Sequence, residues 1–433
     1  MLNSILRTIE RFIPKKLFRV LQPIYHWGLS LLGALVYRFP SRHIRVVAIT
    51  GTKGKSSTAE FINAILEEAG NTTAVLGTIR FKIGETDERN LYKMTVPGRF
   101  FVQRFLRRSV DAGCNWAILE MSSEAAKQFR HLWIDYDALV FTNLAPEHIE
   151  SHGSYENYRA AKLSIANRLA KSRKKETILI ANADDPESNL FLDTNTTYSV
   201  PFSISEAKNL KTEKESSSFL YKRINFTVHL PGLFNVYNAL AAITFAETLN
   251  IDPAVCVSGI DRVTRIRGRA EFIREEQPFD VVVDYAHTPE SLEALYSAFT
   301  GSKNICVLGN TGGGRDTWKR PKMASVAEAH CDQIIFTNED PYDEDPQKII
   351  SAMAEGVTNK EKLSVILDRR EAIREALVRA HKLRNRAKKA RISVLITGKG
   401  SDPYIMGPRG SKLPWDDAMV IREELKNIQK TYA

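Results

Sequence analysis

Two hydrophobic patterns alternate along the chain from residue 44 to its end. Short runs of β-branched and other apolar residues predict buried strands, and longer stretches with apolar residues three or four positions apart predict helices. Strands that alternate with helices are typical of a mostly parallel α/β sheet. In the first half of this region, the runs that predict strands are 46–49, 72–79, 115–121, 138–144 and 177–182.

A second α/β unit with a Rossmann-like pattern begins near Gly268. Its expected strands are 279–287, 304–310, 333–339 and 392–400. Residues 231–248 predict a helix, and the basic stretch 369–391 predicts a helix with a solvated face. The polar run 209–218 predicts an exposed loop or hairpin. We therefore expect a short helical N-terminal segment, a central domain of the P-loop ATPase type and a C-terminal α/β domain, over residues 1–43, 44–265 and 266–433.

The first 43 residues follow a different pattern. Between Arg19 and Arg38 lie 18 residues without a charged side chain, which is at the lower limit for crossing a bilayer. Basic flanks and aromatic residues suit an interfacial position, whereas Pro23 and two glycines weaken a spanning helix. Three interpretations stay open: attachment to the inner membrane surface, a true span, or a helical pair that packs on the rest of the protein.

The distribution of charge and the cysteine content bear on three classes of protein: nucleic-acid-binding, disulfide-framework and zinc-ribbon proteins. The 433 residues carry a net charge of +10, but the first 45 hold eight Lys/Arg and one acid, so +7 of that charge lies at one end. The basic balance is therefore no evidence for nucleic-acid binding. The four cysteines form no CxxC pair, which argues against a disulfide framework or a zinc ribbon and favours a reducing cytoplasm.

A glycine-containing turn between the first strand and the following helical stretch is the main candidate for chemistry. Strand, glycine turn and helix form the layout of a phosphate-binding loop, in which backbone N–H groups and a lysine contact phosphates and a hydroxyl ligates Mg²⁺. Ile49 stands where the full Walker pattern has glycine, so a chance Gly/Lys turn is the alternative. The expected nucleotide-binding residues of this loop are Gly51, Thr52, Lys53, Gly54, Lys55, Ser56 and Ser57.

From residue 44 onward the chain resembles the Mur ligases, and among them the UDP-N-acetylmuramoyl-tripeptide synthetases that add the third peptide residue in bacterial cell-wall synthesis. Each motif alone is weak, but eleven occur in register. They are TGTKGKSS, EMSSEAA, FTNLAPEHIESHG, AAKLSI, GLFNVYNALAA, GRAEFI, DYAHTPESL, GGGRDTWKRP, EDPYDEDP, DRREAI and ITGKGSDPY.

The resemblance implies a set of catalytic residues around the loop. Glu120 and His148 would hold Mg²⁺ beside Ser56, while Lys55 would neutralise the β- and γ-phosphates of ATP. Lys162 aligns with the family lysine that is carbamylated and becomes a further metal ligand. Without the resemblance, the segment around His148 is a polar loop with incidental histidines, and Lys162 is a surface lysine.

The resemblance also implies nucleotide and substrate contacts elsewhere. Asn235 and Asn238 resemble the positions that meet the adenine and the domain junction, although an asparagine at a helix start is also an ordinary cap. Arg269, Asp284 and His287 would close over the triphosphate and exclude water from a labile acyl phosphate. The expected substrate-binding residues are Thr95, Ser122, Ser123, Arg315, Asp340, Pro341, Tyr342, Gly398 and Asp402.

The implied reaction forms an amide bond at the cost of ATP. A substrate carboxylate attacks the γ-phosphate, and an amine then displaces phosphate from the acyl phosphate. The partners expected are a muramyl peptide and an amino acid, with no nucleic acid, in the cytoplasm and with contact to the membrane surface through residues 1–43 as an option.

Two departures from the family pattern leave the substrates open. Only about 43 residues precede the first strand, where these ligases normally carry a UDP-binding α/β domain. Diaminopimelate-adding enzymes have Asp-Asn-Pro-Arg where this chain has Tyr342 in place of the arginine, and Ser401 and Asp402 stand where His and Glu are usual. Lysine or another amino acid is therefore as plausible as diaminopimelate.

Three other functions compete with this interpretation. Folylpolyglutamate synthetases also lack the UDP domain and share the TKGK loop, but the DYAHTP and GKGSDPY segments favour the muramyl branch. A glutaminase-coupled Mur-like subunit would carry a four-cysteine zinc insert, which this sequence does not contain. A non-catalytic, membrane-tethered nucleotide-binding subunit would keep the loop without an amino-acid site.

Overall fold

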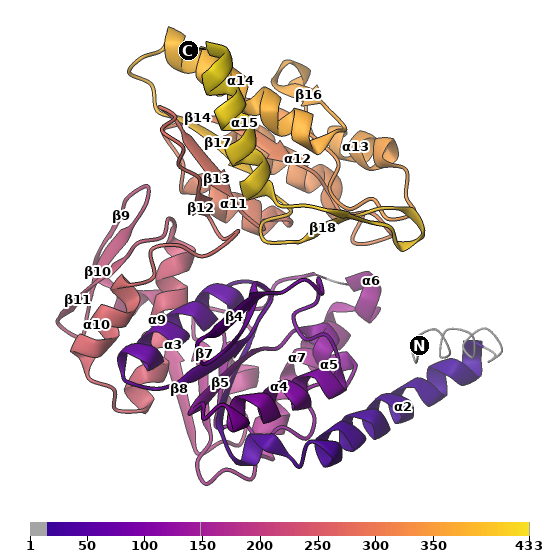
Figure 1. The fold of residues 1–433 in the computed structure, drawn as a ribbon, viewed down its shortest axis with the longest axis vertical. Coiled ribbons are helices and arrows are strands. Elements are labelled where there is room, and N and C mark those ends of the chain that lie inside the picture. Colours follow the sequence, from indigo (N-terminus) through magenta and orange to yellow (C-terminus); the bar gives the residue numbers. More distant parts are fainter. Residues whose placement is uncertain (1–14, 148, 433) are drawn as a thin grey trace.

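Two α/β bodies, each built on its own sheet, make up the described part of the chain (Figure 1). The computed structural model describes residues 15–147 and 149–432. The first body carries an eight-stranded sheet and the second a six-stranded sheet, and both are mostly parallel. The fold class predicted from the sequence is confirmed, and the exact domain boundaries stay predictions.

The central sheet has the strand order β4-β3-β2-β5-β1-β6-β7-β8. It is parallel from β2 to β8, and β3 and β4 extend it as an antiparallel hairpin. Strand β1 lies between β5 and β6, so that Ile49 pairs with Glu120 and Thr50 with Phe141. The strands are β1 (Arg45–Thr50), β2 (Thr73–Leu76), β3 (Arg80–Ile83), β4 (Thr86–Arg89), β5 (Trp116–Glu120), β6 (Ala138–Phe141), β7 (Ile178–Asn182) and β8 (Tyr198–Phe202).

Alternate residues of the central strands enter two separate cores. Val47 and Ile49 pack with α3, α9 and α10 on one face, and Val46 and Ala48 pack with α4, α5 and α7 on the other. Because both faces are covered, these strands are apolar throughout rather than alternating. The helices are α3 (Lys55–Glu68), α4 (Arg99–Asp111), α5 (Ser123–Lys127), α6 (Ile149–His152), α7 (Tyr155–Ala170), α8 (Ser188–Leu192), α9 (Leu233–Thr248) and α10 (Pro253–Asp261).

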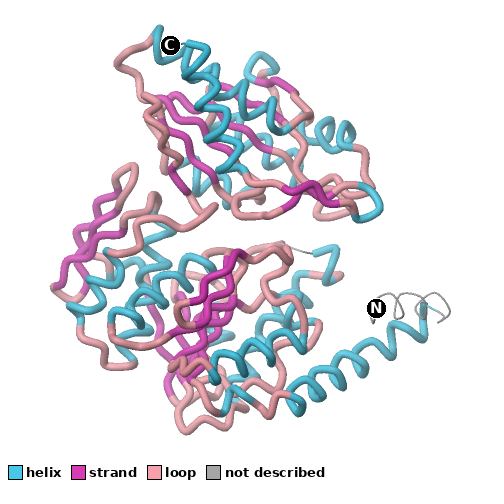
Figure 2. Tube along the Cα trace, in the orientation of Figure 1, coloured by secondary structure: helices cyan, strands magenta, loops and turns pink. Residues whose placement is uncertain are grey.

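A small antiparallel sheet lies at the side of the central body, next to α10 (Figures 1 and 2). Its strands are β9 (Lys208–Thr212), β10 (Ser217–Tyr221) and β11 (Ile224–Val228). The polar run 209–218 thus forms a hairpin between β9 and β10, one of the two arrangements expected from the sequence. Phe219 and Phe226 are buried and stack between β10 and β11, which anchors the sheet to the core.

The second body has the strand order β12-β13-β17-β14-β15-β16, with only β12 antiparallel. Helices α14 and α15 cover one face, and α11, α12 and α13 cover the other. Its strands are β12 (Glu271–Phe272), β13 (Asp280–Val283), β14 (Lys303–Leu308), β15 (Gln333–Phe336), β16 (Leu363–Val365), β17 (Ile392–Ile396) and the hairpin β18 (Tyr404–Met406) and β19 (Lys412–Pro414). Its helices are α11 (Pro289–Ser297), α12 (Lys319–His330), α13 (Pro346–Ala354), α14 (Arg369–Arg386) and α15 (Asp417–Tyr432).

The cysteines depart from the expectation that none is bonded. Cys306 on β14 and Cys331 at the end of α12 form a disulfide in the buried core of the second body, with their Cα atoms 6.1 Å apart. The adjacent strands β14 and β15 bring the two positions together, and the spacing of 25 residues in the sequence gave no sign of it. Cys114 and Cys256 form no disulfide, as expected from the sequence, and both are buried.

The N-terminal segment forms one helix, α2 (Lys15–Val36), rather than a helical pair within the described residues. Its C-terminal half packs on α4, while its first turns extend past the body (Figure 1). Ser30 Oγ donates to the carbonyl of Phe129 at 2.8 Å, and the rings of Trp27 and Trp133 meet edge to face. Among the helices of the described residues, none combines the length and apolarity needed to cross a membrane.

A buried histidine beside α7 makes the stability of the first body depend on pH. His131 is buried, and its Nε2 lies 3.3 Å from Ser164 Oγ. Burial, followed by the charge of Arg168, lowers the pKa of His131 to about 4. The unfolded chain therefore takes up a proton near its ordinary pKa that the folded protein does not bind, and stability falls as pH drops from about 6.5 towards 4.

We predict that His131→Gln flattens this dependence. Glutamine can keep a contact with Ser164 but does not titrate, so between pH 7 and pH 5 the variant should lose about 2 kcal/mol less unfolding free energy than the wild type. Urea unfolding at both pH values measures the difference. Ser164→Ala is the matched control, because it removes the same contact and leaves the histidine. Equal pH slopes in His131→Gln and the wild type would contradict the prediction.

Candidate active site

The turn between β1 and α3 has the backbone geometry of an anion-binding loop. Gly51 and Gly54 adopt positive φ angles of 149° and 84°. A Cβ atom at Gly54 would lie 2.3 Å from Asn238 Oδ1, so α9 packs too closely for any side chain at this position. No side chain caps the N-terminus of α3. Its first N–H groups and the positive end of its dipole are therefore available to a phosphate.

Two lysine side chains donate to the backbone of this loop. Lys55 Nζ donates to the carbonyls of Gly51 and Thr52 at 2.8 and 2.9 Å. Lys162 Nζ, from the buried face of α7, donates to the same Gly51 carbonyl at 2.6 Å. Burial lowers the pKa of Lys55 to about 8, although Glu120 and Glu147 act in the opposite direction. Burial, followed by the charge of Lys55, lowers the pKa of Lys162 well below its ordinary value.

Glu120 ends β5 directly beside the loop. Its Oε2 accepts a hydrogen bond from Ser56 Oγ at 2.9 Å, and its Oε1 accepts one from the Thr78 backbone N–H at 2.9 Å. Thr78 Oγ1 lies 2.9 Å from Thr95 Oγ1. Thr95, which the sequence predicted to bind substrate, is therefore connected through Thr78 to the Glu120 carboxylate. Gly77 leaves room for the carboxylate, since a Cβ there would lie 2.3 Å from Glu120 Oε1.

The oxygen atoms of Glu120 and Ser56 fit a magnesium ion. Mg²⁺ is usually held by one or two carboxylates together with substrate phosphates, and the remaining positions are filled by water. Within the described residues, no group of three or more His, Cys, Asp or Glu side chains could hold a metal by itself. His148, the other predicted ligand, lies outside the described residues.

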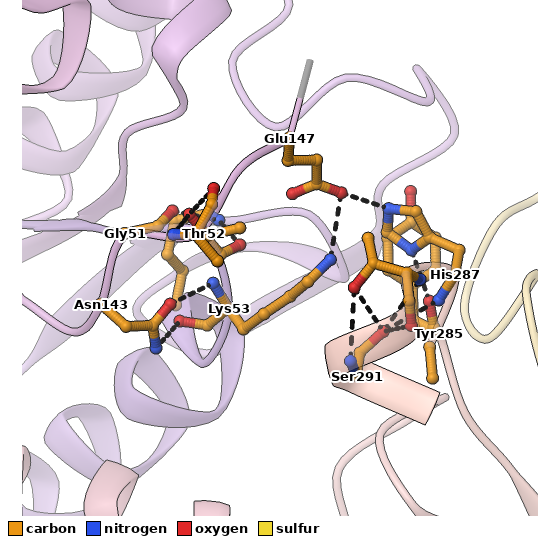
Figure 3. A network of polar contacts seen from close by, with 12 residues as sticks. Gly51, Thr52, Lys53, Asn143, Glu147, Tyr285, His287 and Ser291 are labelled. Atoms are coloured by element: carbon orange, nitrogen blue, oxygen red, sulfur yellow. Dashed lines mark hydrogen bonds and ion pairs between the residues drawn. The ribbon is translucent and has the colours of Figure 1, made fainter. Parts of the chain in front are cut away.

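A bridge of polar contacts joins the loop to the second body (Figure 3). Lys53 Nζ lies 3.0 Å from Glu147 Oε1, and His287 Nε2 lies 2.9 Å from the same oxygen. The other ring nitrogen of His287 is 2.7 Å from the carbonyl of Tyr285. Glu147 thus connects the loop of the first body with the segment after β13 in the second.

Arg269 contacts the loop of the first body directly, whereas Asp284 contacts backbone groups within the second body. Arg269 Nη2 donates to Ser56 Oγ at 3.3 Å, and its guanidinium lies 4.5 Å from the ring centroid of Tyr285. Asp284 accepts hydrogen bonds from the backbone N–H groups of Ala270 and Ala286, both at 2.6 Å. Asp284 therefore holds the turns that carry Arg269 and His287.

The two predicted adenine-site asparagines lie at the start of α9. Asn235 Nδ2 donates to the Pro231 carbonyl at 2.8 Å, and Asn238 Nδ2 donates to Asn235 Oδ1 at 3.1 Å. Asn238 Oδ1 also lies 3.4 Å from Thr58 Oγ1 on α3. Asn235 thus fixes the helix start, and Asn238 contacts the nucleotide loop and its helix.

A buried cluster of opposite charges lies where the sequence predicted the amino-acid site. Lys399 Nζ donates to Asp340 Oδ1 at 2.9 Å and lies 3.3 Å from Asp402 Oδ2. Lys93, from the loop after β4 in the first body, pairs with Asp340 and lies 3.3 Å from Asp402 Oδ2. Burial raises the pKa of Asp340, but the two ammonium groups outweigh it and lower this pKa below its ordinary value.

The other predicted substrate residues surround this cluster or lie at α5. Arg315 is exposed and stands 5.1 Å from the ring centroid of Tyr342, next to the buried Pro341. A Cβ at Gly398 would lie 2.2 Å from Glu339 Oε2, so the backbone approaches that carboxylate closely. Ser122 caps α5, and Ser123 Oγ lies 3.2 Å from His152 Nε2.

Comparison with known proteins identifies the family. One family model, described as the Mur ligase middle domain, matches residues 49–246, and another, described as the Mur ligase, glutamate ligase domain, matches residues 268–400. A UDP-N-acetylmuramoyl-L-alanyl-D-glutamate–2,6-diaminopimelate ligase of Syntrophomonas wolfei is 37% identical over 419 residues, which cover 93% of this chain and 82% of that protein. The chain belongs to the Mur ligase family. A UDP-N-acetylmuramyl-tripeptide synthetase of a Roseiflexus species is 35% identical, with the same coverage of 93% and 82%.

Solved structures agree with this assignment. A UDP-N-acetylmuramoyl-L-alanyl-D-glutamate–2,6-diaminopimelate ligase matches with a TM-score of 0.59 and 26% identity, covering 89% of this chain and 79% of that one. The Mycobacterium tuberculosis folylpolyglutamate synthase complexed with ADP matches with a TM-score of 0.68 and 17% identity, covering 86% and 91%, which shows a shared fold alone. The predicted Mur-type resemblance and ligase class are confirmed.

The sequence motifs did not lead to a prediction for several residues of this Mur ligase site. Glu147, Lys93 and Lys399 were not singled out, although each makes two or more of the contacts that join the parts of the site. Glu147 adjoins the predicted His148, and Lys399 lies inside the GKGSDPY motif, so the motifs contained a signal for both. No sequence motif pointed to Lys93, because its partners are more than 240 positions away in the chain.

We predict that Gly54→Ala impairs nucleotide binding in this Mur ligase. The change requires a left-handed conformation of alanine and a shift of Asn238, so we expect the affinity for ATP to fall by at least about tenfold. Isothermal titration calorimetry measures it. Gly70→Ala is the matched control, since Gly70 has a φ of 80° but nothing within 4 Å of an added Cβ. Equal ATP affinities in the two variants would contradict the prediction.

Proposed function

We propose that the chain is an ATP-dependent acid–amino acid ligase that adds an amino acid to a muramyl-peptide precursor in peptidoglycan biosynthesis, with Mg²⁺ as cofactor. The observation that carries the proposal is the meeting of the loop lysines, Glu120 and Arg269 at one junction between the two bodies. The names of the relatives support a muramyl-peptide acceptor. We place the reaction in the cytoplasm, where ATP and such precursors are available.

The loop is suited to hold the triphosphate. The uncapped turn of α3 and Lys55 would bind the β- and γ-phosphates, and the acceptor carboxylate would attack the γ-phosphorus. A new carboxylate oxygen–phosphorus bond forms while the bond to the β–γ bridging oxygen breaks, which gives an acyl phosphate and ADP. The amine then attacks the acyl carbon, phosphate leaves with the bonding electrons, a proton is released, and an amide remains.

Ser56, Glu120 and, from its motif, His148 would hold Mg²⁺. When bound, this ion supplies positive charge against the phosphate oxygens. Arg269 and His287 come from the second body and would close the site against water, which protects the acyl phosphate.

Lys162 is proposed as the carbamylated lysine of the family. Carbamylation requires a neutral amine that can attack carbon dioxide, and burial of Lys162 favours the neutral form. The product would replace a second cation at the Gly51 carbonyl with a carboxylate-like group. The carbamate on Lys162 would then be an anion close to Lys55, and its oxygen atoms would be suitable ligands for Mg²⁺.

We propose that the incoming amino acid carries a cationic side chain. Asp340 and Asp402 form a pair of carboxylates that already holds two ammonium groups, and one of these, Lys93, comes from the other body. Lys93 would mark the place that the side-chain ammonium of the substrate takes. Tyr342 offers no charge for a second carboxylate at this place, which favours lysine over diaminopimelate.

We predict that Lys93→Met lowers the KM for lysine. Removing this ammonium eliminates a competitor and leaves the carboxylates with excess negative charge, so the KM should fall by about tenfold while kcat changes little. Steady-state phosphate release measures both constants. Lys82→Met, which removes another ion-paired lysine from the same edge of the sheet, is the control. A KM for lysine that rises or stays constant in Lys93→Met would show that Lys93 only joins the two bodies.

The proposed function is tested by phosphate release from ATP across a matrix of substrates. The acceptors are UDP-muramyl-dipeptide and folate, and the amino acids are lysine, diaminopimelate and glutamate. We expect release only when the muramyl dipeptide and an amino acid are both present, with Lys55→Ala as the inactive control. Release with folate and glutamate but not with the muramyl dipeptide would establish the folylpolyglutamate synthetase alternative. ATP binding without release in any combination would favour a non-catalytic subunit.

A further inference from the structure

One face of α2 carries large apolar side chains that nothing in the described chain covers. Its inner face packs on the first body through Ser30, Gly33 and Ala34. The outer face is apolar over three turns, and its residues, with their exposed fractions, are Ile24 (65%), Tyr25 (42%), Leu32 (48%), Leu35 (53%) and Val36 (56%). We call these five residues the α2 outer face. They project from one side of the helix because they follow its three- and four-residue spacing.

The α2 outer face lies between two groups of basic residues. No charged residue occurs between Arg19 and Arg38, whereas Lys15, Lys16 and Arg19 precede it in the sequence and Arg38 follows it. On the neighbouring α4, Arg107 Nε donates to the carbonyl of Tyr37 at 3.3 Å, and Arg104 and Arg108 are exposed. The first 45 residues contain eight Lys/Arg and a single acid, Glu10.

We propose that the α2 outer face docks on an anionic bilayer, with the helix lying in the plane of the membrane surface. An apolar stripe with basic flanks and with aromatic residues at its border is the composition of helices that bind at the interface. Tyr25, within the α2 outer face, and Trp27, whose ring also packs on Trp133, are 42% and 46% exposed and supply the aromatic side chains. The helix would bind along its length, which agrees with the absence of a membrane-spanning helix among the described residues.

Charge favours a bilayer over a second copy of the chain. Two copies that met through their α2 outer faces would bring two sets of basic residues together, whereas anionic headgroups would neutralise them. The α2 outer face is also separate from the junction that contains Glu120 and Arg269, because α2 packs on α4 and against Phe129 and Trp133, whereas Glu120 ends β5 beside the loop. Membrane docking therefore leaves the substrates free to reach the site, and it does not depend on which acceptor the enzyme uses.

The test is co-sedimentation of the full chain with vesicles. One set contains phosphatidylcholine alone, and the other contains about one third phosphatidylglycerol. We expect at least about tenfold stronger binding to the anionic vesicles, and a loss of most of this preference at high salt. The double variant Leu32→Glu/Leu35→Glu should lose at least about tenfold in affinity, because it places two acids in the apolar face.

Met419→Glu is the matched control, since Met419 is 55% exposed on α15 of the second body and its substitution should leave vesicle binding unchanged. Circular dichroism and ATP turnover without vesicles should be the same in all variants, which separates docking from folding and from the proposed function. The proposal is overturned if the wild type does not bind anionic vesicles, or if the double variant binds as the wild type does. It is also overturned if the wild type forms a dimer that the double variant does not form, since a second copy would then cover this face.

Discussion

The convergence of two lysine side chains on one carbonyl oxygen is the constraint around which the site is arranged. Lys55 and Lys162 both donate to Gly51 O, and both have pKa values lowered by burial. Two ammonium ions at one oxygen repel each other, so the arrangement is stable only if one lysine is neutral or if an anion enters. A triphosphate supplies such an anion for Lys55, and a carbamate on Lys162 would remove the second positive charge altogether.

The carboxylates that offset this positive charge belong to the first body, whereas the second body contributes Arg269 and His287 to the same junction. Glu120 and Glu147 both contact residues of the loop, and each is shared between several partners. Glu147 contacts Lys53 on one side and His287 on the other, so the junction between the bodies is itself part of the charge balance. A nucleotide that changes the charge at the loop would therefore change the energy of this junction, which is how ligand binding can be linked to domain closure.

The sequence predicted those features that depend on neighbours in the chain. The strand, glycine turn and helix around Gly51 were predicted correctly, because the β-branched run, the glycines and the helical spacing are local signals. The layered α/β fold followed from the alternation of such segments. Short strands such as β3, β4 and β12 were missed, since a few residues cannot show a period, and the pairing of Cys306 with Cys331 depends on which strands are adjacent.

The remaining part of the site could not be predicted because its contacts connect distant segments. Lys93 reaches Asp340 only because the loop after β4 lies against the second body, and no local pattern specifies that arrangement. Motif resemblance named Asp340 and Asp402 but carried no information about a cation already bound to them. The placement of α2 could not be predicted from local patterns either, because its uncharged run allowed three interpretations. Only the packing of Ser30 and Ala34 showed which side of the helix is turned inward and which side needs another surface.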